Sequence, residues 1–183
     1  MGRNKLFKRE DVTEKALQVF WRKGYLDTSL KDLEEATGVF KPALYSEFGD
    51  KEGLFLECIR HYRERYSGKL LLQKEPLGWK NIEAFLLSVL PQKGEKGCFE
   101  TLAFARDIPA LKEPLKKLGE ENAERIVLAI KDNLTAGGVE AKKAETLAGT
   151  IFIFYGGLSV LANLQPRKKL ESRAKEFLDQ IRG

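Results

Sequence analysis

The stretch from residue 28 to residue 55 constrains the fold most, because it holds two short helix patterns separated by a glycine turn at Gly38. Apolar residues recur at helical spacing on both sides of that turn: Leu30, Leu33, Ala36, Leu44 and Phe48. Thr28 or Ser29 is suited to cap the first helix. Pro42 falls in the first turn of the second helix, where its missing N–H is not needed. The outward side of the second helix is left to small, basic and hydroxyl residues, which is typical of a helix that is inserted into a partner.

The rest of the chain also follows helical spacing, and no segment alternates convincingly as a strand does. Asp50 is a good N-cap for the helix that follows it. Glycine and proline residues separate the other helix patterns, which are expected at about 12–23, 51–66, 79–90, 98–106, 110–136, 141–164 and 170–181. The sequence therefore predicts an all-α fold of about nine helices.

The chain of 183 residues carries a formal net charge of +5 and is 43% hydrophobic. It can bury a core, and its mildly basic balance permits an anionic partner without requiring one. The first nine residues hold four basic side chains and no acid, and no long apolar segment follows them, so they are not a secretory signal. They form either a flexible basic arm or a solvated tail. The expected location is the cytoplasm.

Residues for catalysis or metal binding are scarce. Cys58 and Cys98 stand far apart, and His61 is the single histidine, so no zinc site or other metal centre is expected. The sequence also lacks phosphate-binding glycine loops and nucleophile motifs, which argues against an enzyme and against a cofactor. The two cysteines either sense oxidants or, as the favoured alternative, are small buried hydrophobic residues.

Two short helices around a glycine turn are typical of a helix-turn-helix motif, here at about residues 28–48, whose second helix enters the major groove of DNA. With Leu44 and Phe48 facing the core, the outward side is left to Lys41, Pro42, Ala43, Tyr45 and Ser46. Such side chains suit phosphates, base edges and thymine methyls. Thr28, Ser29 and Lys51 stand where helices begin and can meet phosphates. The structural alternatives are that Thr28 and Ser29 are caps only, that Tyr45 is packing and that Lys51 is solvated.

Residues 8–55 resemble the N-terminal domain of the tetracycline-repressor (TetR) family of bacterial transcription regulators. The matching motifs, in the order and spacing of the family, are A-L-Q-V-F-W-R-K-G-Y at 16–25, T-S-L-K-D-L at 28–33, A-T-G-V at 36–39 and A-L-Y-S-E-F-G-D-K-E-G-L at 43–54. The resemblance covers about a quarter of the chain. The remainder is similar only in length and helical character.

The resemblance implies a homodimer that binds a palindromic double-stranded DNA operator, most often as a repressor, and leaves it when a small molecule occupies the C-terminal domain. It implies a DNA-binding domain over residues 1–50 and an effector-binding and dimerisation domain over residues 51–183. Carried over by position, Thr28, Ser29 and Lys51 contact phosphates and residues 41–45 lie on the recognition helix. The chain departs from the family at Phe40, where a small polar residue is common. Phe40 either meets DNA or turns inward.

The dimer interface is expected on the last two helices, which are apolar or amphipathic and would form a four-helix bundle across a two-fold axis. Its expected residues are Ile151, Gly156, Gly157, Leu170, Ala174, Phe177 and Ile181. A glycine inside a helix costs about 1 kcal/mol relative to alanine. The glycine pair therefore indicates close approach of another backbone, with room for a ligand or a simple kink as the alternatives.

The effector is expected to be small and apolar or aromatic, because few ionisable residues interrupt the later helices. Aromatic and apolar side chains that would line its pocket, or else form plain core, are Tyr62, Phe85, Phe99, Leu102, Phe152 and Tyr155. The uncharged run 146–165 approaches the length of a membrane span, but its glycine and polar residues favour a helix buried on all sides inside the protein. We therefore expect no membrane partner.

Three other classes of protein were compared with this hypothesis. An architectural DNA-binding protein without a ligand would not need the large region beyond residue 50. The sequence lacks the catalytic motifs that a small helical enzyme would need. A membrane-anchored protein would need the run 146–165 to span a bilayer. A ligand-responsive DNA-binding regulator accounts for both halves of the chain.

Overall fold

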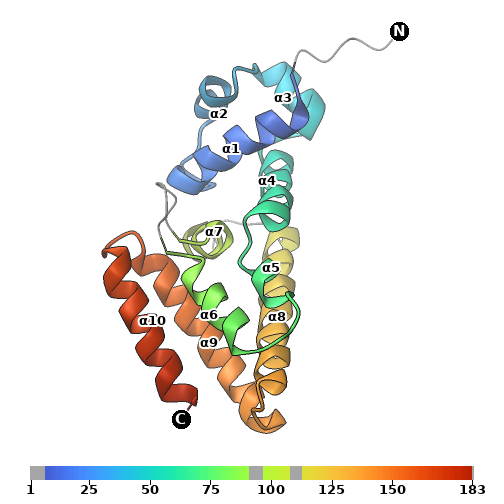
Figure 1. The fold of residues 1–183 in the computed structure, drawn as a ribbon. Coiled ribbons are helices and arrows are strands. Elements are labelled where there is room, and N and C mark those ends of the chain that lie inside the picture. The colour runs from blue at the N-terminus through green and yellow to red at the C-terminus, as the bar shows by residue number, and fades with distance from the viewer. Residues whose placement is uncertain (1–6, 91–96, 108–112, 183) are drawn as a thin grey trace. The chain divides into compact units, whose positions relative to one another are not determined.

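A computed structural model describes residues 7–90, 97–107 and 113–182, and the described residues form an all-helical fold without strands (Figure 1). The helical segments within these ranges are α1 (Arg9–Lys23), α2 (Leu30–Thr37), α3 (Lys41–Phe48), α4 (Lys51–Arg65), α5 (Lys69–Leu72), α6 (Trp79–Leu87), α7 (Phe99–Asp107), α8 (Glu113–Ala136), α9 (Ala141–Leu161) and α10 (Arg167–Arg182). The all-α prediction is confirmed. The one segment that helical periodicity did not reveal is α5, which has only four residues.

The chain forms two compact units. The first takes in α1–α4, up to Tyr66, together with the segment Ala103–Leu115; the second takes in Ser67–Leu102 and Lys116 onwards. Helix α7 therefore contributes its first residues to the second unit and its last residues to the first. The N-terminal unit extends beyond the expected boundary at residue 50 because α4 packs along α1.

Aromatic rings fill the core of the first unit. Phe20 and Phe55 are fully buried and meet edge to face, with centroids 5.1 Å apart. Tyr25 lies 4.9 Å from Phe55. Trp21 and Tyr62 form a second edge-to-face pair at 5.4 Å. These pairs join α1 to α4, so the helix that follows the predicted DNA-binding motif shares its hydrophobic core.

The second unit is built from α5, α6, α8, α9 and α10. Phe85 of α6 and Tyr155 of α9 stack at 4.0 Å, and both are buried. The fully buried Asn133 of α8 donates to the carbonyl of Leu72 at 2.8 Å and accepts from the Gly78 amide at 2.9 Å. A buried amide with these partners fixes the loop before α6.

Helix α9 buries only one of its faces, although its apolar residues extend nearly all round. Its inward stripe is Ala144, Ala148, Ile151, Tyr155, Leu158 and Ser159. Ile153 and Val160 are 76% and 47% exposed on another face, and Leu164, in the turn after α9, is 75% exposed. By length and composition alone α9 is apolar enough to cross a membrane, and 33% of its most apolar window is buried. The expectation of a helix buried on all sides is therefore wrong for the single chain.

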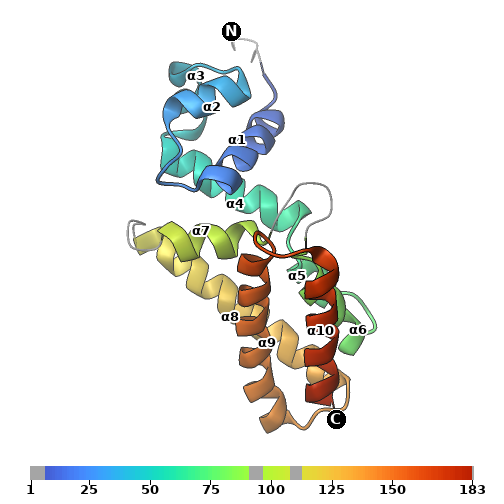
Figure 2. The same cartoon turned by 90° about the vertical axis from the view of Figure 1, so that its left-hand side faces the viewer.

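Helix α10 lies beside α9 (Figure 2). Its inward residues are Leu170, Ala174 and Leu178, and Phe177 stacks on Phe154 of α9 at 4.0 Å. Three residues expected at a dimer interface, Ile151, Leu170 and Ala174, are at most 1% exposed in the single chain. They are core residues of the protomer, because α9 and α10 pack against each other along the stripe to which these residues belong.

Candidate nucleic-acid interface

Helix α2 begins with a complete capping box. Ser29 Oγ accepts from the Asp32 amide at 3.1 Å, and the Asp32 carboxylate accepts from the Ser29 amide at 2.8 Å. The hydrogen bonds from Lys23 and Ser29 keep the pKa of Asp32 well below its usual range. Gly38 ends α2 in the left-handed conformation, with φ of 74°, a backbone geometry that favours glycine. Ser29, rather than Thr28, is thus the cap of α2.

Thr28 is buried and has a partner inside the protein. It is 1% exposed, and its hydroxyl donates to the carbonyl of Gly24 at the end of α1. Its hydroxyl therefore supports the turn between α1 and α2, and a phosphate contact by Thr28 stays a prediction. Ser29 is exposed and keeps a hydroxyl at the start of α2, where an anion is favoured.

The N-terminal cap of helix α3 comes from a residue of another helix. Its N-cap residue is Phe40, which has no side-chain cap hydrogen bond. The carboxylate of Glu34, on α2, instead accepts from the Lys41 amide at 2.6 Å. A carboxylate at a helix N-terminus also interacts favourably with the helix dipole. Glu34 therefore caps α3 in place of a side chain at position 40, and it was not among the residues that the sequence indicated.

The orientation of α3 follows the prediction from spacing. Leu44 and Phe48 are buried, at 1% and 8% exposure. The residues left exposed are Phe40, Lys41, Pro42, Ala43 and Ser46, and Tyr45 is half-buried. Phe40 is 77% exposed, so of the two alternatives for this residue it takes the outward one. The ammonium of Lys41 lies 5.4 Å from the centroid of the Tyr45 ring, which keeps these two side chains together.

A groove runs beside this outward side. Its lining includes Lys8, Asp11 and Lys15 at or near the start of α1, and Phe40, Pro42, Ser46 and Glu47 at and along α3. Both lysines and carboxylates therefore border the groove. Lys8 and Lys15 supply the positive charge that suits the sugar-phosphate backbone of a duplex whose bases α3 would read.

Lys51 is neither fully solvated nor free to extend. Its ammonium lies 4.7 Å from the centroid of Tyr25 and donates to the carbonyl of Leu26 at 3.4 Å. Burial lowers the pKa of Lys51, and the nearby carboxylates of Asp107 and Asp27 oppose that shift. Lys51 thus stands at the start of α4 with one long, weak hydrogen bond that a phosphate can replace.

The residues expected to line an effector pocket do not all lie together. Tyr62 belongs to the first unit, where it packs on Trp21. Phe85, Tyr155 and Phe152 form an aromatic group in the second unit, with Phe152 6.5 Å from Tyr155. Phe99 is fully buried, and Leu102 is half-buried. Burial raises the pKa of Tyr155 well above its usual value, so its hydroxyl stays protonated.

Both cysteines are buried. Burial raises the pKa of the Cys58 thiol, and its sulfur lies 3.5 Å from the carbonyl of Thr13 in the α1–α4 interface. A buried thiol held in its protonated form reacts slowly with oxidants. Cys58 therefore fits the favoured interpretation of a small core residue. Among the described residues, no group of three His, Cys, Asp or Glu side chains is arranged to hold a metal ion.

The family model described as "Bacterial regulatory proteins, tetR family" matches residues 12–58. The HTH-type transcriptional repressor ComR of Escherichia coli (strain K12) is 48% identical over 68 residues, which are 37% of this chain and 32% of ComR. The matched part thus spans about a third of the length of that relative. The residues matched by the family model lie within the first unit, where the expected DNA contacts lie.

Solved structures extend the likeness to the whole chain. A cysteine mutant of the TetR family transcriptional regulator CifR, complexed with 26-bp double-strand operator DNA, has a TM-score of 0.83 and 26% identity, and the match covers 97% of this chain and 98% of that chain. A TetR transcriptional regulator from Legionella pneumophila has a TM-score of 0.79 and 21% identity over 97% of this chain and 98% of that chain. Both neighbours are described as transcriptional regulators.

Proposed function

We propose, from the premise that this chain is a transcriptional regulator of the TetR family, that it represses transcription as a homodimer bound to a palindromic operator. A small apolar or aromatic effector held in the second unit would release it, and the cytoplasm is its expected location. The observation that carries the proposal is the outward side of α3. Six neighbouring positions, 40–43, 45 and 46, are exposed or half-buried while Leu44 and Phe48 anchor the helix.

Operator reading would divide between these side chains. Lys41 and Tyr45 would meet base edges or phosphates in the major groove, and Ala43 and Phe40 would meet apolar groups such as thymine methyls. Ser29, Lys51 and the groove lysines would bind phosphates and set the register. The complex of CifR with operator DNA supports this assignment, since the fold of that protein is matched over almost the whole chain.

Dimerisation would use the outward face of α9 rather than its inward stripe. Ile153 and Val160 are exposed there, and Gly156 and Gly157 lie between them with open space where a Cβ would be. Leu164 is exposed in the turn that follows α9. Small residues between apolar ones allow two helices to approach closely. Phe177 and Ile181 of α10 are half-buried and remain available at the edge of this surface. The proposed interface therefore keeps four of the seven expected residues and adds Ile153, Val160 and Leu164.

Effector binding is proposed at the aromatic group of Phe85, Phe152 and Tyr155 in the second unit. Stacked rings with a single protonated hydroxyl suit an aromatic or apolar ligand. An architectural protein without a ligand is the rival function. Such a protein would stay bound to its operator at every concentration of an added aromatic compound, even when that compound protects the second unit against thermal unfolding.

The proposal is tested with an operator selected by the wild-type protein from a library of random duplexes. We expect Lys41→Ala and Tyr45→Ala each to abolish binding to the selected duplex in a shift assay at fixed salt, while sedimentation still shows a folded dimer. The reason is that both side chains face outward and contribute little to the core.

The matched control is Lys80→Ala, which removes the same charge from an exposed position on α6 and is expected to bind the operator as the wild type does. Unchanged binding by both α3 variants, or failure of the wild type to select any duplex, would overturn the assignment of α3 as the reading helix.

A further inference from the structure

We propose that Arg9, the first residue of α1, is a positioning residue for operator reading, because it fixes the C-terminal end of α3 against α4. This inference rests on the proposed function, in which α3 reads the operator. Arg9 faces away from the outward side chains of α3 and was not indicated by the sequence. It touches the two helices on either side of the Gly49–Asp50 junction.

The contacts of Arg9 with α3 involve three different groups of its last turn. Arg9 Nη1 donates to Glu47 Oε1 at 2.7 Å and to the Glu47 carbonyl at 3.0 Å. The guanidinium also lies 4.5 Å from the centroid of the Phe48 ring. A cation that binds a C-terminal carbonyl interacts favourably with the helix dipole. The last turn of α3 is thus held by side chain, backbone and ring together.

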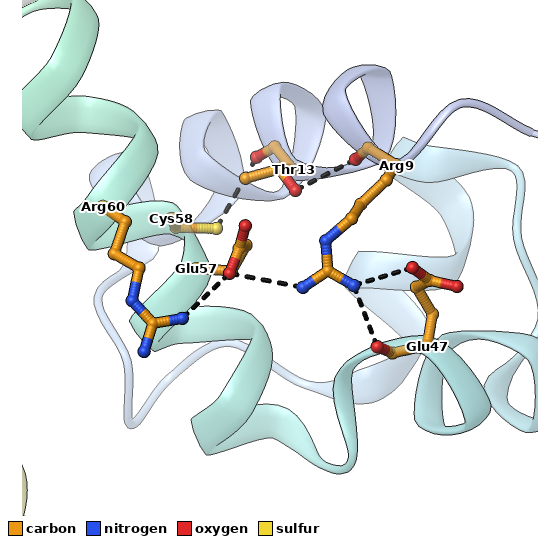
Figure 3. Close-up of polar contacts among 6 residues, drawn as sticks. All are labelled: Arg9, Thr13, Glu47, Glu57, Cys58 and Arg60. Carbon is orange, nitrogen blue, oxygen red and sulfur yellow. Dashed lines mark hydrogen bonds and ion pairs between the residues drawn. The ribbon is translucent and has the colours of Figure 1, made fainter.

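The contact of Arg9 with α4 passes through Glu57. Arg9 Nη2 lies 3.3 Å from Glu57 Oε2, and the same oxygen accepts from Arg60 Nη1 at 3.1 Å (Figure 3). Burial opposes the ionisation of Glu57, but the two arginines outweigh it and lower the pKa of the carboxyl. Glu57 therefore stays charged near neutral pH, and the Arg9 contact joins α1, α3 and α4 at one point.

The same geometry argues against Arg9 as a phosphate contact. Its charge is shared between two carboxylates, and a guanidinium between two carboxylates has little net attraction for an anion. Its fork is instead matched to the Glu47 and Glu57 oxygens. The reading residues Lys41 and Tyr45 lie within two turns of Glu47 on the same short helix. A tilt at the anchored end would therefore displace the side chains that meet the bases.

The experiment compares Arg9→Gln with the wild type on two duplexes, the operator selected by the wild type and a scrambled sequence of the same length, over a series of salt concentrations. We expect operator affinity to fall by about tenfold or more, since small misplacements of recognition groups have large effects. Affinity for the scrambled duplex and the dependence of log K on log salt should stay at their wild-type values. Arg9→Lys keeps the charge but not the fork, and should recover only part of the operator preference.

The matched control is Arg60→Gln. It removes the same charge and a hydrogen bond to the same Glu57 oxygen, but it lies on α4 and has no bond to α3 in Figure 3. It should keep the full operator preference. Circular dichroism checks that each variant is folded. If Arg9→Gln does not fold, the same comparison is made with Arg9→Lys and Glu57→Gln in its place. Glu57→Gln should then lower operator preference in the same direction.

Two outcomes would overturn the inference alone. The first is an equal loss of affinity for both duplexes with a salt slope smaller by about 0.9, the value for one phosphate contact on B-form DNA. The second is that Arg9→Gln, or both Arg9→Lys and Glu57→Gln, prefers the operator over the scrambled duplex as strongly as the wild type does. A wild-type protein that prefers no duplex would overturn the proposed function, and this inference with it.

Discussion

Phe40 is the most exposed large apolar side chain of the described residues, with 77% of its surface in solvent. It makes no cap hydrogen bond, so the folded single chain gains little from it. Large apolar residues at such positions often belong to an interaction surface. Phe40 also borders the groove between α1 and α3, which places it at the edge of the proposed DNA contact.

Phe40→Ala is expected to change operator choice without changing stability. The free energy of unfolding should stay within about 0.5 kcal/mol of the wild type, as for surface substitutions away from caps and cores. Selection of duplexes from a random library should return a sequence altered at positions that face the start of α3. Recovery of the wild-type operator at unchanged affinity would show that the ring lies outside the contact. Pro42→Ala, on the same exposed turn, is the comparison variant.

Single residues are also where sequence reasoning was least complete. Thr28 and Ser29 are adjacent hydroxyl residues with equal suitability as caps, yet one is buried on the Gly24 carbonyl and the other caps α2. The difference arises from the path of the chain after α1, which local spacing does not contain. Glu34 and Arg9 were missed for a related reason, because each acts on a helix other than its own.

Helices α1 and α4 are joined by a buried histidine and a carboxylate. His61 Nε2 lies 2.8 Å from Glu14 Oε2, which also accepts from the Tyr66 hydroxyl at 3.0 Å, and Gln18 donates to the other Glu14 oxygen at 3.1 Å. Burial raises the pKa of Glu14, but these hydrogen bonds outweigh it and lower the pKa overall. The interaction thus favours the charged form of Glu14 in the folded state.

The stability of the first unit should therefore depend on Glu14 in a predictable pH range. A carboxyl whose pKa is lower when folded stabilises the protein above its unfolded pKa, about 4.3, and the contribution is lost as pH falls through the lower folded pKa. Glu14→Gln should destabilise by on the order of 1 kcal/mol at pH 7, with the difference from wild type shrinking below about pH 4. Urea titrations at several pH values measure this. A difference that is the same at pH 7 and pH 3 would contradict the linkage.

Elements were predicted well where their period was unambiguous. The patterns at 12–23, 51–66 and 170–181 correspond to α1, α4 and α10. A helix was predicted at α9, but which of its faces is buried was not, because apolar residues occupy nearly every side. Ile151 shares the inward stripe of α9 with Tyr155, which stacks on Phe85 of α6, whereas Ile153 faces solvent.

At the scale of the whole molecule, the outward face of α9 leaves the single chain incomplete. Ile153 and Val160 are exposed there, and Leu164 is exposed in the turn after it. A Cβ added at Gly156 or Gly157 on this face would meet no side chain within 4 Å. Soluble proteins rarely leave such surfaces uncovered, and a two-fold partner presenting the same face would cover it. This is the surface on which the proposed dimer depends.

Gly156→Asp should convert the dimer to a monomer in sedimentation velocity, because it places a charge inside the proposed contact while open space surrounds that Cβ in the protomer. Phe177 is a less clear site for such a test, since its ring stacks on Phe154 of the same chain. Gly156→Ala should raise the stability of the isolated protomer by about 1 kcal/mol through helix propensity. Lys175→Asp, on the exposed side of α10, is the control. A dimer that persists in Gly156→Asp would place the interface elsewhere.

The sequence resemblance to the family covered the first unit and little more. The physical reason is that the two units have different structural requirements. Within the matched residues 12–58, Leu44 and Phe48 are buried and hold α3 in one posture, which restricts the spacing of this segment. The second unit needs only helices of suitable length around a core, so many sequences satisfy it. Its aromatic group at Phe85 and Tyr155 was predicted as a set of candidates, but the pairing of the rings depends on the register of α6 against α9.

The bond from Glu34 to the Lys41 amide has a consequence for how such proteins diverge. Because the cap of α3 comes from α2 and reaches a backbone group, it does not depend on which side chains occupy positions 40–43. Mutations there can accumulate without loss of the helix start, so target sequences can drift between lineages while the scaffold is inherited unchanged. Grafting residues 40–46 from a relative that has an acidic residue at position 34 is then a direct way to exchange one operator for another.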